Sequence, residues 1–466
     1  MPSHVLIMAA GKGTRMRSNR PKVLHRLAGL PLLEHVIRAA QSLEPKSTGI
    51  VIGHQAERIR ASLSEHKGLR FAVQVEQLGT GHALLQAMPL LRNQCGTLVV
   101  LSGDVPLIQP STLRRLLTTH HAASAALTVV TARVTRAYGY GRVVRNKEGR
   151  LSRIVEERDA SDTQRQLNEI NGGIYALDLE PLFDALRDIL RAGAADELYL
   201  PSLVKVYRRR GLPVETLEVT NPDEVRGINS QTELAEVRRI VRQSKNEELM
   251  AVGVTLEDPA TTYVDRDVTV GPDTVIHPGV ILEGHTRVGA RCELHAGVRI
   301  VDSTVGDDVV VNNHCVIQRT RIERGARVGP FAHLRPETEV GENARIGNFV
   351  ETKKTTLGQG SKANHLTYLG DATIGAGVNV GAGTITCNYD GDAKHPTTIG
   401  NGVFIGSGTE LVAPVSLEDG AYIAAGSCIT EDVPAGALGV ARNRQVNKVG
   451  WAGRRKVPSG PTTTGS

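Results

Sequence analysis

The sequence predicts an α/β protein of two domains, in which an N-terminal Rossmann-like domain with a mostly parallel sheet precedes a C-terminal parallel β-helix. Two observations lead to this prediction. Up to about residue 226, short apolar runs alternate with helical patterns, which is typical of a parallel α/β sheet. From about residue 251, an aliphatic residue recurs every six positions, which is the signature of a parallel β-helix. The length of 466 residues suffices for two or three domains.

The N-terminal strands are predicted from short apolar runs that end beside a glycine. Val5–Ala10 and Leu98–Leu101 are two of them, and the spacing within Leu32–Ile37 indicates a helix between them. Gly11–Gly13 follows the first run directly, and Ser102–Asp104 follows the second. Ligands of parallel sheets bind beyond the carboxyl ends of the strands. We therefore expect both segments at one edge of the sheet, in a ligand site.

Residues 230–250 predict a long helix between the domains. The segment is charged and contains neither Gly nor Pro, and its apolar residues at positions 234, 237, 240 and 241 follow helical spacing. We therefore divide the chain into a first domain over residues 1–226, a linker helix over 227–250 and a β-helix domain over 251–466.

The six-residue repeat dominates the C-terminal half. Its aliphatic positions are Val264, Val270, Ile276, Leu282, Val288, Leu294, Ile300, Val305, Val311, Ile317, Ile322, Val328, Leu334, Val340, Ile346, Leu357, Ile374, Val380, Ile399, Ile405, Leu411, Leu417, Ile423 and Ile429. A small residue such as Thr274, Ala326 or Ala344 often stands four positions later. Each repeat predicts one short strand with its aliphatic side chain inward, and neighbouring coils stabilise one another by stacking. Three repeats form one coil, so that residues 264–431 correspond to about nine coils and roughly 45 Å.

Two segments depart from the repeat. Thr386–Thr398 is polar and off-register, which predicts a loop that protrudes from the coil. The tail from about residue 457 is rich in Pro, Ser, Gly and Thr, which predicts disorder.

Composition narrows the class of protein. The net charge is +6, but Lys and Arg are dispersed and do not alternate with aromatic residues, so we expect phosphorylated small molecules rather than nucleic acid as ligands. The five cysteines show no CxxC spacing, which argues against a disulfide framework and a zinc site. No apolar run approaches the roughly 18 residues that span a bilayer, and Val5–Ala10 lacks the features of a signal peptide. We expect a cytoplasmic protein without a membrane span.

The turn after the first strand has the composition of a phosphate site. Gly11 and Gly13 allow backbone N–H groups to approach phosphate oxygens, and Lys12, Arg15 and Lys22 supply positive charge. The turn is neither a Walker loop nor a GxGxxG motif, because GxxxxGK[ST] is absent and position 16 is Met. By itself, such a turn is equally compatible with a purely structural role.

The set of motifs is more specific than any one of them. The N-terminal blocks are Gly11–Met16 with Pro21 and Lys22, Gln77–Ala83, Gly103–Leu107, Gly139–Arg142, Ile154–Glu156, Glu169–Asn171 and Gly227–Asn229. The C-terminal blocks are Phe331–Pro336, Glu351–Lys354, His365–Asp371 and Asn379–Asp390. In order and spacing, over essentially the whole chain, they resemble those of the bifunctional N-acetylglucosamine-1-phosphate uridyltransferase/glucosamine-1-phosphate acetyltransferase family.

The resemblance implies a bifunctional transferase that makes UDP-N-acetylglucosamine, a precursor of peptidoglycan and lipopolysaccharide. The C-terminal domain would acetylate glucosamine-1-phosphate with acetyl-CoA. The N-terminal domain would then transfer a uridylyl group from UTP to N-acetylglucosamine-1-phosphate and release pyrophosphate. The resemblance also implies a left-handed β-helix and a homotrimer with acyl-transfer sites shared between chains.

The same resemblance implies roles for N-terminal residues. Asp104 and Asn229 would hold Mg²⁺, which prefers oxygen ligands. The residues that would bind UTP or UDP-N-acetylglucosamine are Met8, Ala9, Ala10, Gly11, Lys22, Gln74, Gly79, Thr80, Ser102, Gly103, Asp104, Gly141, Glu156, Asn171 and Asn229. Among these, Gly141, Glu156 and Asn171 would hold the sugar. Relatives often carry Tyr where this chain has Ser102, so that one contact with the nucleotide or sugar differs here. Taken alone, Asp104 is also compatible with a simple turn.

In the C-terminal domain, the resemblance makes His365 the base that takes a proton from the attacking sugar amine, a task suited to imidazole. Glucosamine-1-phosphate would bind to Arg335, Lys353, Tyr368 and Asn379. Acetyl-CoA would contact Ala382, Asn388, Tyr389, Ser407, Ala425 and Arg442, with Asn388 and Tyr389 near the reacting groups. Taken alone, His365 is compatible with a solvated side chain.

Several residues receive no catalytic role. His277, His285, His295, His314 and His333 also lie on the predicted β-helix and are assigned none. Cys387, beside the predicted loop, is interpreted as a packing residue. Two other functions remain open: a single-function pyrophosphorylase whose β-helix serves assembly or regulation, and a non-catalytic scaffold. The presence of Lys353, His365, Asn388 and Tyr389 favours the bifunctional enzyme.

Overall fold

A computed structural model describes residues 1–191 and 198–454 of the chain, so the tail predicted to be disordered from about residue 457 lies outside the described residues. The chain forms two compact units, residues 1–242 and residues from 243 onward. The division falls inside helix α9 (Gln231–Ala251), which occupies the segment predicted as a linker helix.

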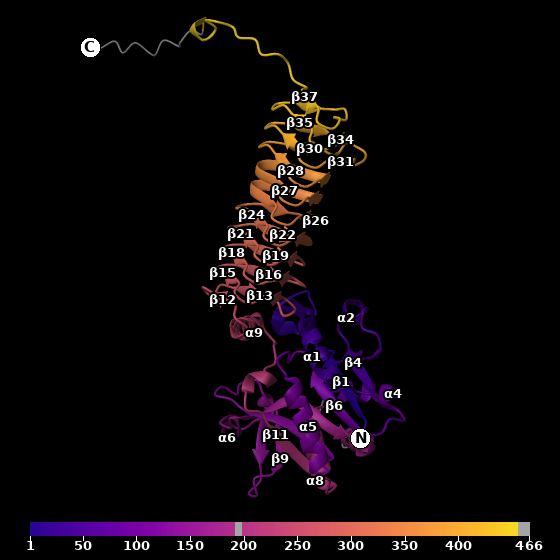
Figure 1. Cartoon of the computed structure of the whole chain (residues 1–466). Coiled ribbons are helices and arrows are strands. Elements are labelled where there is room, and N and C mark those ends of the chain that lie inside the picture. Colours follow the sequence, from indigo (N-terminus) through magenta and orange to yellow (C-terminus); the bar gives the residue numbers. More distant parts are fainter. Residues whose placement is uncertain (192–197, 455–466) are drawn as a thin grey trace, which may run out of the picture. The chain divides into compact units, whose positions relative to one another are not determined.

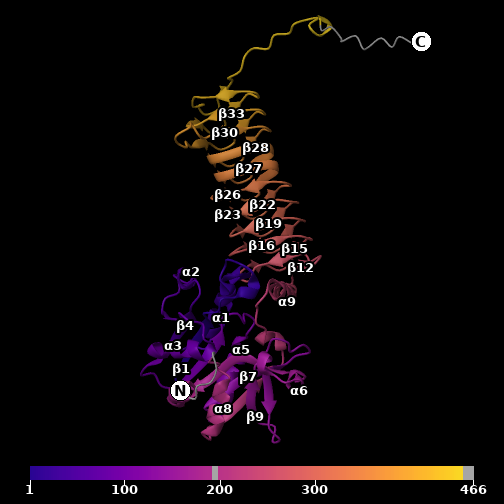
Figure 2. The same ribbon diagram turned by 180° about the vertical axis from the view of Figure 1, so that it is seen from behind.

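The first unit is built on one sheet (Figures 1 and 2). Its strands are β1 (Ser3–Ala9), β4 (Ser47–Ile52), β5 (Leu69–Val73), β6 (Thr97–Ser102), β7 (Leu127–Arg133), β8 (Arg142–Arg145), β9 (Leu151–Val155), β10 (Glu169–Asp178) and β11 (Val214–Glu218). Their order is β11-β7-β10-β6-β1-β4-β5, and β8 pairs with β10 while β9 pairs with β8. A small separate sheet pairs β2 (Arg26–Leu27) with β3 (Leu30–Pro31). Neighbours β5, β4, β1 and β6 run parallel, whereas β10 runs antiparallel to β6 and β7. The predicted mostly parallel sheet is confirmed.

Helices cover both faces of this sheet. They are α1 (Leu32–Gln41), α2 (Ala56–Ser62), α3 (Thr80–Gln86), α4 (Met88–Leu91), α5 (Pro110–Ala122), α6 (Asp162–Arg165), α7 (Leu179–Arg191) and α8 (Ser202–Arg209). Alternate residues of the central strands point to opposite faces. Thus Leu6 packs in a core with α3, α4, α7 and α8, whereas Val5 and Ile7 pack in a second core with α1, α2 and α5.

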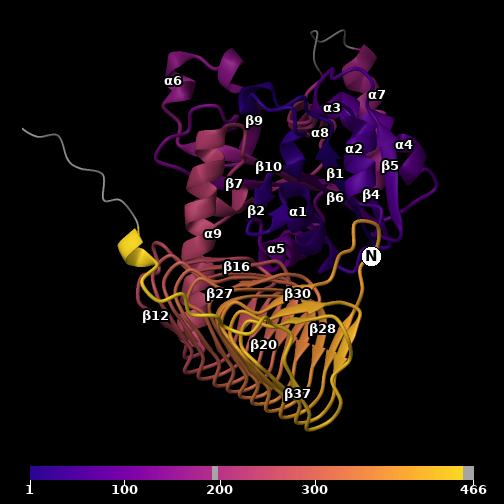
Figure 3. The same cartoon turned by 90° about the horizontal axis from the view of Figure 1, so that it is seen from above.

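The second unit is a parallel β-helix. Its strands are β12 (Thr255–Leu256), β13 (Tyr263–Val264), β14 (Thr269–Val270), β15 (Val275–Ile276), β16 (Ile281–Glu283), β17 (Arg287–Val288), β18 (Glu293–Leu294), β19 (Arg299–Val301), β20 (Thr304–Val305), β21 (Val310–Val311), β22 (Val316–Gln318), β23 (Thr320–Ile322), β24 (Arg327–Val328), β25 (His333–Leu334), β26 (Thr338–Val340), β27 (Arg345–Leu357), β28 (Lys362–Ile374), β29 (Asn379–Val380), β30 (Ile385–Cys387), β31 (Thr397–Ile399), β32 (Phe404–Ile405), β33 (Glu410–Val412), β34 (Val415–Leu417), β35 (Tyr422–Ile423), β36 (Cys428–Ile429) and β37 (Leu438–Gly439). Most strands pair in parallel with the strand three places later in the sequence, for example β12 with β15, so that each coil has three sides. Figure 3 shows successive coils superimposed in a view close to the coil axis.

The aliphatic residues of the repeat fill the core of this coil, as predicted. Every aliphatic position named for the repeat is buried, and the small residues Thr274, Ala326 and Ala344 are fully buried as well. Where the aliphatic series is interrupted, Thr352 and Ala363 take the inward position, so that the coil continues.

One loop leaves the β-helix where the sequence departs from the repeat. β30 ends at Cys387 and β31 begins at Thr397, and Tyr389 and Lys394 pair across the intervening segment. The predicted loop is therefore present but shorter than expected, because Thr386 and Thr397 are buried in the flanking strands. We call residues 388–396 the side loop. Within the described part of the chain, none of the helices has the length and apolarity to cross a membrane.

Candidate functional sites

The first candidate site lies at the carboxyl edge of the parallel strands. β1 and β6 are neighbours and pair Met8 with Ser102, so that the segments following them are adjacent, as predicted. A cavity of about 290 Å³ opens there. Its lining consists of Met8, Ala9, Ala10, Gly11, Lys22, Val23, Gln74, Gln77, Gly79, Thr80, Ala83, Ser102, Asp104 and Tyr199. Ten of the fifteen residues predicted to bind the sugar nucleotide are among them, and Val23 and Tyr199 are additions that lie outside the motif blocks.

The glycine-rich turn brings Lys22 into this cavity. Gly13 has a φ of 61°, and a Cβ at this position would lie 2.8 Å from Cβ of Lys22. Both the left-handed backbone and the close approach require glycine. Gly13 therefore allows the segment around Lys22 to pack directly against the turn.

Lys22, Asp104 and Asn229 form a charged cluster at the cavity. The Lys22 ammonium forms an ion pair with Oδ2 of Asp104 and donates a hydrogen bond of 3.0 Å to Oδ1 of Asn229. One cationic group thus contacts both oxygens that were predicted to hold Mg²⁺. A pair of oxygen donors that already attracts a cation fits a hard divalent ion.

A capping box holds Asn229 in place. Ser230 and Glu233 stand at the start of α9, where Ser230 Oγ accepts a 3.2 Å hydrogen bond from the Glu233 N–H. The Glu233 carboxylate in turn accepts from the N–H groups of Asn229 and Ser230, at 2.6 and 3.0 Å. This reciprocal arrangement satisfies donors that a helix start leaves free. Ile228 N–H also donates to the carbonyl oxygen of Asp104, which ties the two oxygen donors together.

The start of α3 forms another wall of the cavity. Gln74 is buried and donates to the carbonyl oxygen of Gly79 at 3.1 Å. Gly79 has a φ of 96°, and a Cβ there would lie 2.4 Å from the carbonyl oxygen of Leu198. The Thr80 hydroxyl accepts a hydrogen bond from the N–H of Leu200 at 3.0 Å. The structure therefore brings together the three residues predicted to bind the nucleotide here.

The residues predicted to hold the sugar gather around Gly141. A Cβ on Gly141 would lie 3.4 Å from Oε1 of Glu156 and 3.6 Å from Cβ of Asn171. Asn171 is fixed by donating to the Tyr175 hydroxyl at 2.6 Å and by accepting from the N–H of Gly173 at 3.0 Å.

Glu156 differs from its neighbours because its carboxylate has no hydrogen-bond or ion-pair partner within the described residues. Burial raises the pKa of Glu156, and the nearby Asp159 raises it further. A partly buried carboxylate without a partner is poised to accept hydroxyl hydrogen bonds from a ligand.

Ser102 lies between the residues predicted to hold the sugar and the cavity. Its hydroxyl donates to the carbonyl oxygen of Gly173 at 3.3 Å, and Ser102 also lines the cavity. Gly103 is placed by a hydrogen bond of 2.9 Å from its N–H to the Met8 carbonyl oxygen.

The second candidate site lies on the β-helix beside the side loop and contains a group of cationic side chains. Lys353 lies on β27, and Arg335 follows β25, where it forms an ion pair of 2.7 Å with Glu351. The pKa of the Lys353 ammonium is lowered, chiefly because the ammonium of Lys394 lies beside it, and Arg335 adds to this effect. Such mutual repulsion would be relieved by an anion such as a phosphate.

The side loop also carries the polar groups of Asn388 and Tyr389. Asn388 is buried and donates to the Asp371 carboxylate, and the Tyr389 hydroxyl donates to the carbonyl oxygen of Gly391. A Cβ on Gly370 would contact both the Tyr368 hydroxyl and Nδ2 of Asn388. Gly370 therefore allows Tyr368 and Asn388 to approach one another.

His365 lies three residues before Tyr368 on β28 and is exposed. Parallel pairing of β27 with β28 sets Asn348 opposite His365, and Nδ1 of His365 lies 3.0 Å from Oδ1 of Asn348. With Nδ1–H donating to this amide oxygen, Nε2 carries the free lone pair. Among the described residues, no hydrogen bond or ion pair joins His365 to Lys353 or Arg335. Asn379 begins β29, opposite Lys362 of β28.

Four of the six predicted acetyl-CoA residues form a ladder along the coil, whereas Asn388 and Tyr389 lie in the side loop. Ala382, Ser407 and Ala425 follow strands that pair with one another, and the Gly408 N–H donates to the Ala382 carbonyl oxygen at 2.7 Å. Arg442 lies at the same ladder, because its Cδ would be 3.7 Å from a Cβ on Gly426.

Four residues with clear contacts to these sites were not identified from the sequence: Asn348, Lys394, Glu233 and Tyr199. Asn348 could have been found from the register of the repeat, since it lies one coil before His365. Cys387 is partly buried, and burial raises the pKa of its thiol, which agrees with a packing role.

Comparisons with known proteins agree with both halves of the chain. The family of MobA-like NTP transferase domains matches residues 5–209, and the family of bacterial transferase hexapeptides (six repeats) matches residues 319–354 and 396–431. The bifunctional protein GlmU of Trichlorobacter lovleyi is 46% identical over 454 residues, which cover 97% of this chain and 99% of that protein. The proteins of the same name from Geobacter sulfurreducens and Streptococcus suis are 48% and 45% identical, and each alignment covers 97% of this chain and 98% of the relative.

Proposed function

The chain belongs to the family of bifunctional GlmU proteins, and we propose that its two units catalyse the two successive steps by which glucosamine-1-phosphate becomes UDP-N-acetylglucosamine. It is a transferase with a nucleotidyltransferase half and an acyltransferase half. One observation carries the proposal: each compact unit contains its own set of converging polar side chains, and the two sets share no residue.

Acetyl transfer takes place on the β-helix. The amine of glucosamine-1-phosphate attacks the thioester carbon of acetyl-CoA, the new C–N bond forms, and the C–S bond breaks with its electron pair leaving on sulfur. His365 takes the amine proton at Nε2, because Nδ1 is committed to Asn348. Arg335, Lys353 and Lys394 bind the sugar phosphate, and Tyr368 and Asn379 orient the sugar. Asn388 and Tyr389 lie near the reacting groups, and the ladder of Ala382, Ser407, Ala425 and Arg442 binds coenzyme A.

Uridylyl transfer takes place in the first unit. A phosphate oxygen of N-acetylglucosamine-1-phosphate attacks the α-phosphorus of UTP in line, and the bond to the β-phosphate breaks to release pyrophosphate. The turn at Gly11 and the start of α3 hold the nucleotide, while Gly141, Glu156 and Asn171 hold the sugar. Positioning and neutralisation of charge supply the catalysis, and no covalent intermediate is required.

Asp104 and Asn229 are the residues that would hold Mg²⁺ in this reaction. Their oxygens already share the Lys22 ammonium, so the donor set suits a hard cation. When bound, the ion neutralises negative charge that accumulates on the phosphates.

The most informative experiment is release of the coenzyme A thiol when the full chain meets acetyl-CoA and glucosamine-1-phosphate in the absence of UTP. Rapid release that depends on the sugar supports the acetyltransferase assignment. The alternative is a single-function pyrophosphorylase with a structural β-helix. It would follow if no thiol appears from protein that still makes pyrophosphate from UTP and N-acetylglucosamine-1-phosphate.

We also propose that the chain works as a homotrimer in the cytoplasm. The β-helix presents its candidate acyl site on an open surface, which agrees with a site completed by a neighbouring chain. The five cysteines are all free thiols, as expected in a reducing compartment. Sedimentation equilibrium of the full chain tests the assembly, since a mass of one chain would contradict it.

A further inference from the structure

Two histidines and a glutamate gather on the outer face of the β-helix, and none of the three is among the residues assigned to either reaction. His277 follows β15, while Glu293 lies on β18 and His295 follows it. β15 and β18 pair in parallel, with Ile276 opposite Leu294, so the next residues, His277 and His295, become neighbours in successive coils. Their rings stack, with centroids 4.6 Å apart and planes 12° apart.

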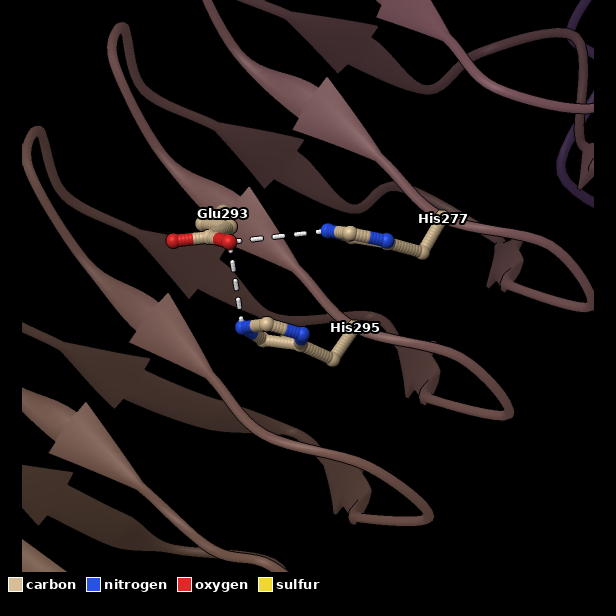
Figure 4. Close-up of side chains that lie close together, drawn as sticks. All are labelled: His277, Glu293 and His295. Carbon is tan, nitrogen blue, oxygen red and sulfur yellow. Dashed lines mark ion pairs between the residues drawn. The ribbon is translucent and has the colours of Figure 1, made fainter.

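The polar atoms of the three side chains converge (Figure 4). Nε2 of His277 and Nε2 of His295 lie 3.5 and 3.3 Å from the same oxygen, Oε1 of Glu293. Two ligands of a tetrahedral zinc ion, each 2.0–2.1 Å from it, lie about 3.3 Å apart. The observed separations are therefore close to those of a metal site. The Nε2 atom of His277 is shielded from solvent and forms no hydrogen bond with any described residue, so its only polar contact in the cluster is the 3.5 Å separation from Glu293.

Glu257 orients the first of these imidazoles. Its Oε2 lies 2.9 Å from Nδ1 of His277, one coil before it. With Nδ1–H donating to this carboxylate, the Nε2 lone pair of His277 faces Glu293. A carboxylate that holds the remote nitrogen of a ligating histidine is a common feature of metal sites, where it fixes the tautomer and raises the basicity of the ligand.

We propose that His277, Glu293 and His295 bind one divalent transition metal ion of the zinc class, with water as a further ligand and Glu257 in the outer shell. Imidazole and carboxylate together suit such an ion, whereas Mg²⁺ favours oxygen donors. The nearly parallel rings would tilt toward each other on binding. Among the residues that the structure describes, this is the only group of three His, Cys, Asp or Glu side chains whose ligand atoms all lie within 4.8 Å. The ion would link two adjacent coils.

The test is zinc binding to the full chain, prepared without an affinity tag and stripped with a chelator. Equilibrium dialysis is carried out with Mg²⁺ in excess, so that oxygen-only sites are occupied. We expect the variant His277→Ala/His295→Ala to bind one zinc fewer per chain than wild type. The matched control His285→Ala removes an exposed histidine of the same unit outside the cluster and should bind as wild type does. Glu257→Gln should weaken binding about 10- to 100-fold.

Thermal unfolding separates metal binding from a defect in folding. In EDTA, the isosteric variant Glu293→Gln should unfold at the same temperature as wild type. Zinc should raise the midpoint of wild type and His285→Ala but leave that of Glu293→Gln unchanged. Equal zinc binding by wild type and the double histidine variant would overturn the proposal. So would an equal rise in the midpoint of wild type and Glu293→Gln.

Discussion

The tautomer of a single histidine is central to the proposed acetyl transfer. Asn348 accepts a hydrogen bond from His365 and thereby leaves Nε2 free to act as the base. Replacing His365 by Ala should lower kcat for acetyl transfer by about 10² to 10⁴-fold and leave uridylyl transfer unchanged. Replacing Asn348 by Ala removes one hydrogen bond and should lower acetyl transfer about five- to tenfold. The pH profile of kcat should shift in Asn348→Ala, and an unchanged profile would argue against this positioning role.

The ionised carboxylate of Glu156, which is proposed to bind the sugar, should lower the stability of the folded protein. Burial raises its pKa, so the folded state holds this proton more tightly than the unfolded chain does. Stability is therefore lost as pH rises from the ordinary pKa of a glutamate through the raised one. We expect Glu156→Gln to raise Tm at pH 7, with a gain that disappears near about pH 4, and to impair uridylyl transfer.

Glu148→Gln, which changes an exposed glutamate of the same unit, serves as the control and should leave Tm unchanged at both pH values. Thermal unfolding of the three proteins across this pH range measures the effect. A lower Tm for Glu156→Gln at both pH values would mean that the carboxylate stabilises the fold instead.

At the scale of elements, the start of α9 positions a proposed metal ligand. The Glu233 carboxylate holds the N–H of Asn229, and loss of such a cap costs about 1 kcal/mol, or roughly fivefold in an equilibrium constant. Glu233→Ala should therefore raise the Mg²⁺ concentration required for uridylyl transfer severalfold while acetyl transfer is unaffected. Glu236→Ala, which removes an exposed carboxylate from the next turn of the same helix, should have no such effect. Equal Mg²⁺ requirements in the two variants would contradict the positioning role.

The elements themselves could largely be predicted from the sequence. The six-residue period specifies both the strand direction and the inward side chains, because stacked coils must bury the same face. Contacts that depend on loop conformation could not be predicted. Lys394 reaches Lys353 only through the fold of the side loop, which the repeat does not encode. His277 and His295 show an intermediate case, since the spacing of the coils places them side by side, yet nothing in either residue alone indicates a site.

At the scale of the whole molecule, the candidate sites lie in different compact units, and the intermediate N-acetylglucosamine-1-phosphate should be released into solution between the steps. A chain that lacks one activity should then be complemented by a chain that lacks the other. Asp104→Ala should lose uridylyl transfer and retain acetyl transfer, because it removes one of the two oxygen donors shared with Lys22. His365→Ala should show the reverse pattern.

The central claim is that one chain carries two independent catalytic sites, and the most direct test is to mix these two variants. With glucosamine-1-phosphate, acetyl-CoA, UTP and Mg²⁺ present, formation of UDP-N-acetylglucosamine is followed for each variant alone and for the mixture. We predict at most a slow, residual formation of product by either variant alone and much faster, steady formation by the mixture. A mixture that makes no product, although each variant retains its own half-reaction, would contradict free release between two independent sites.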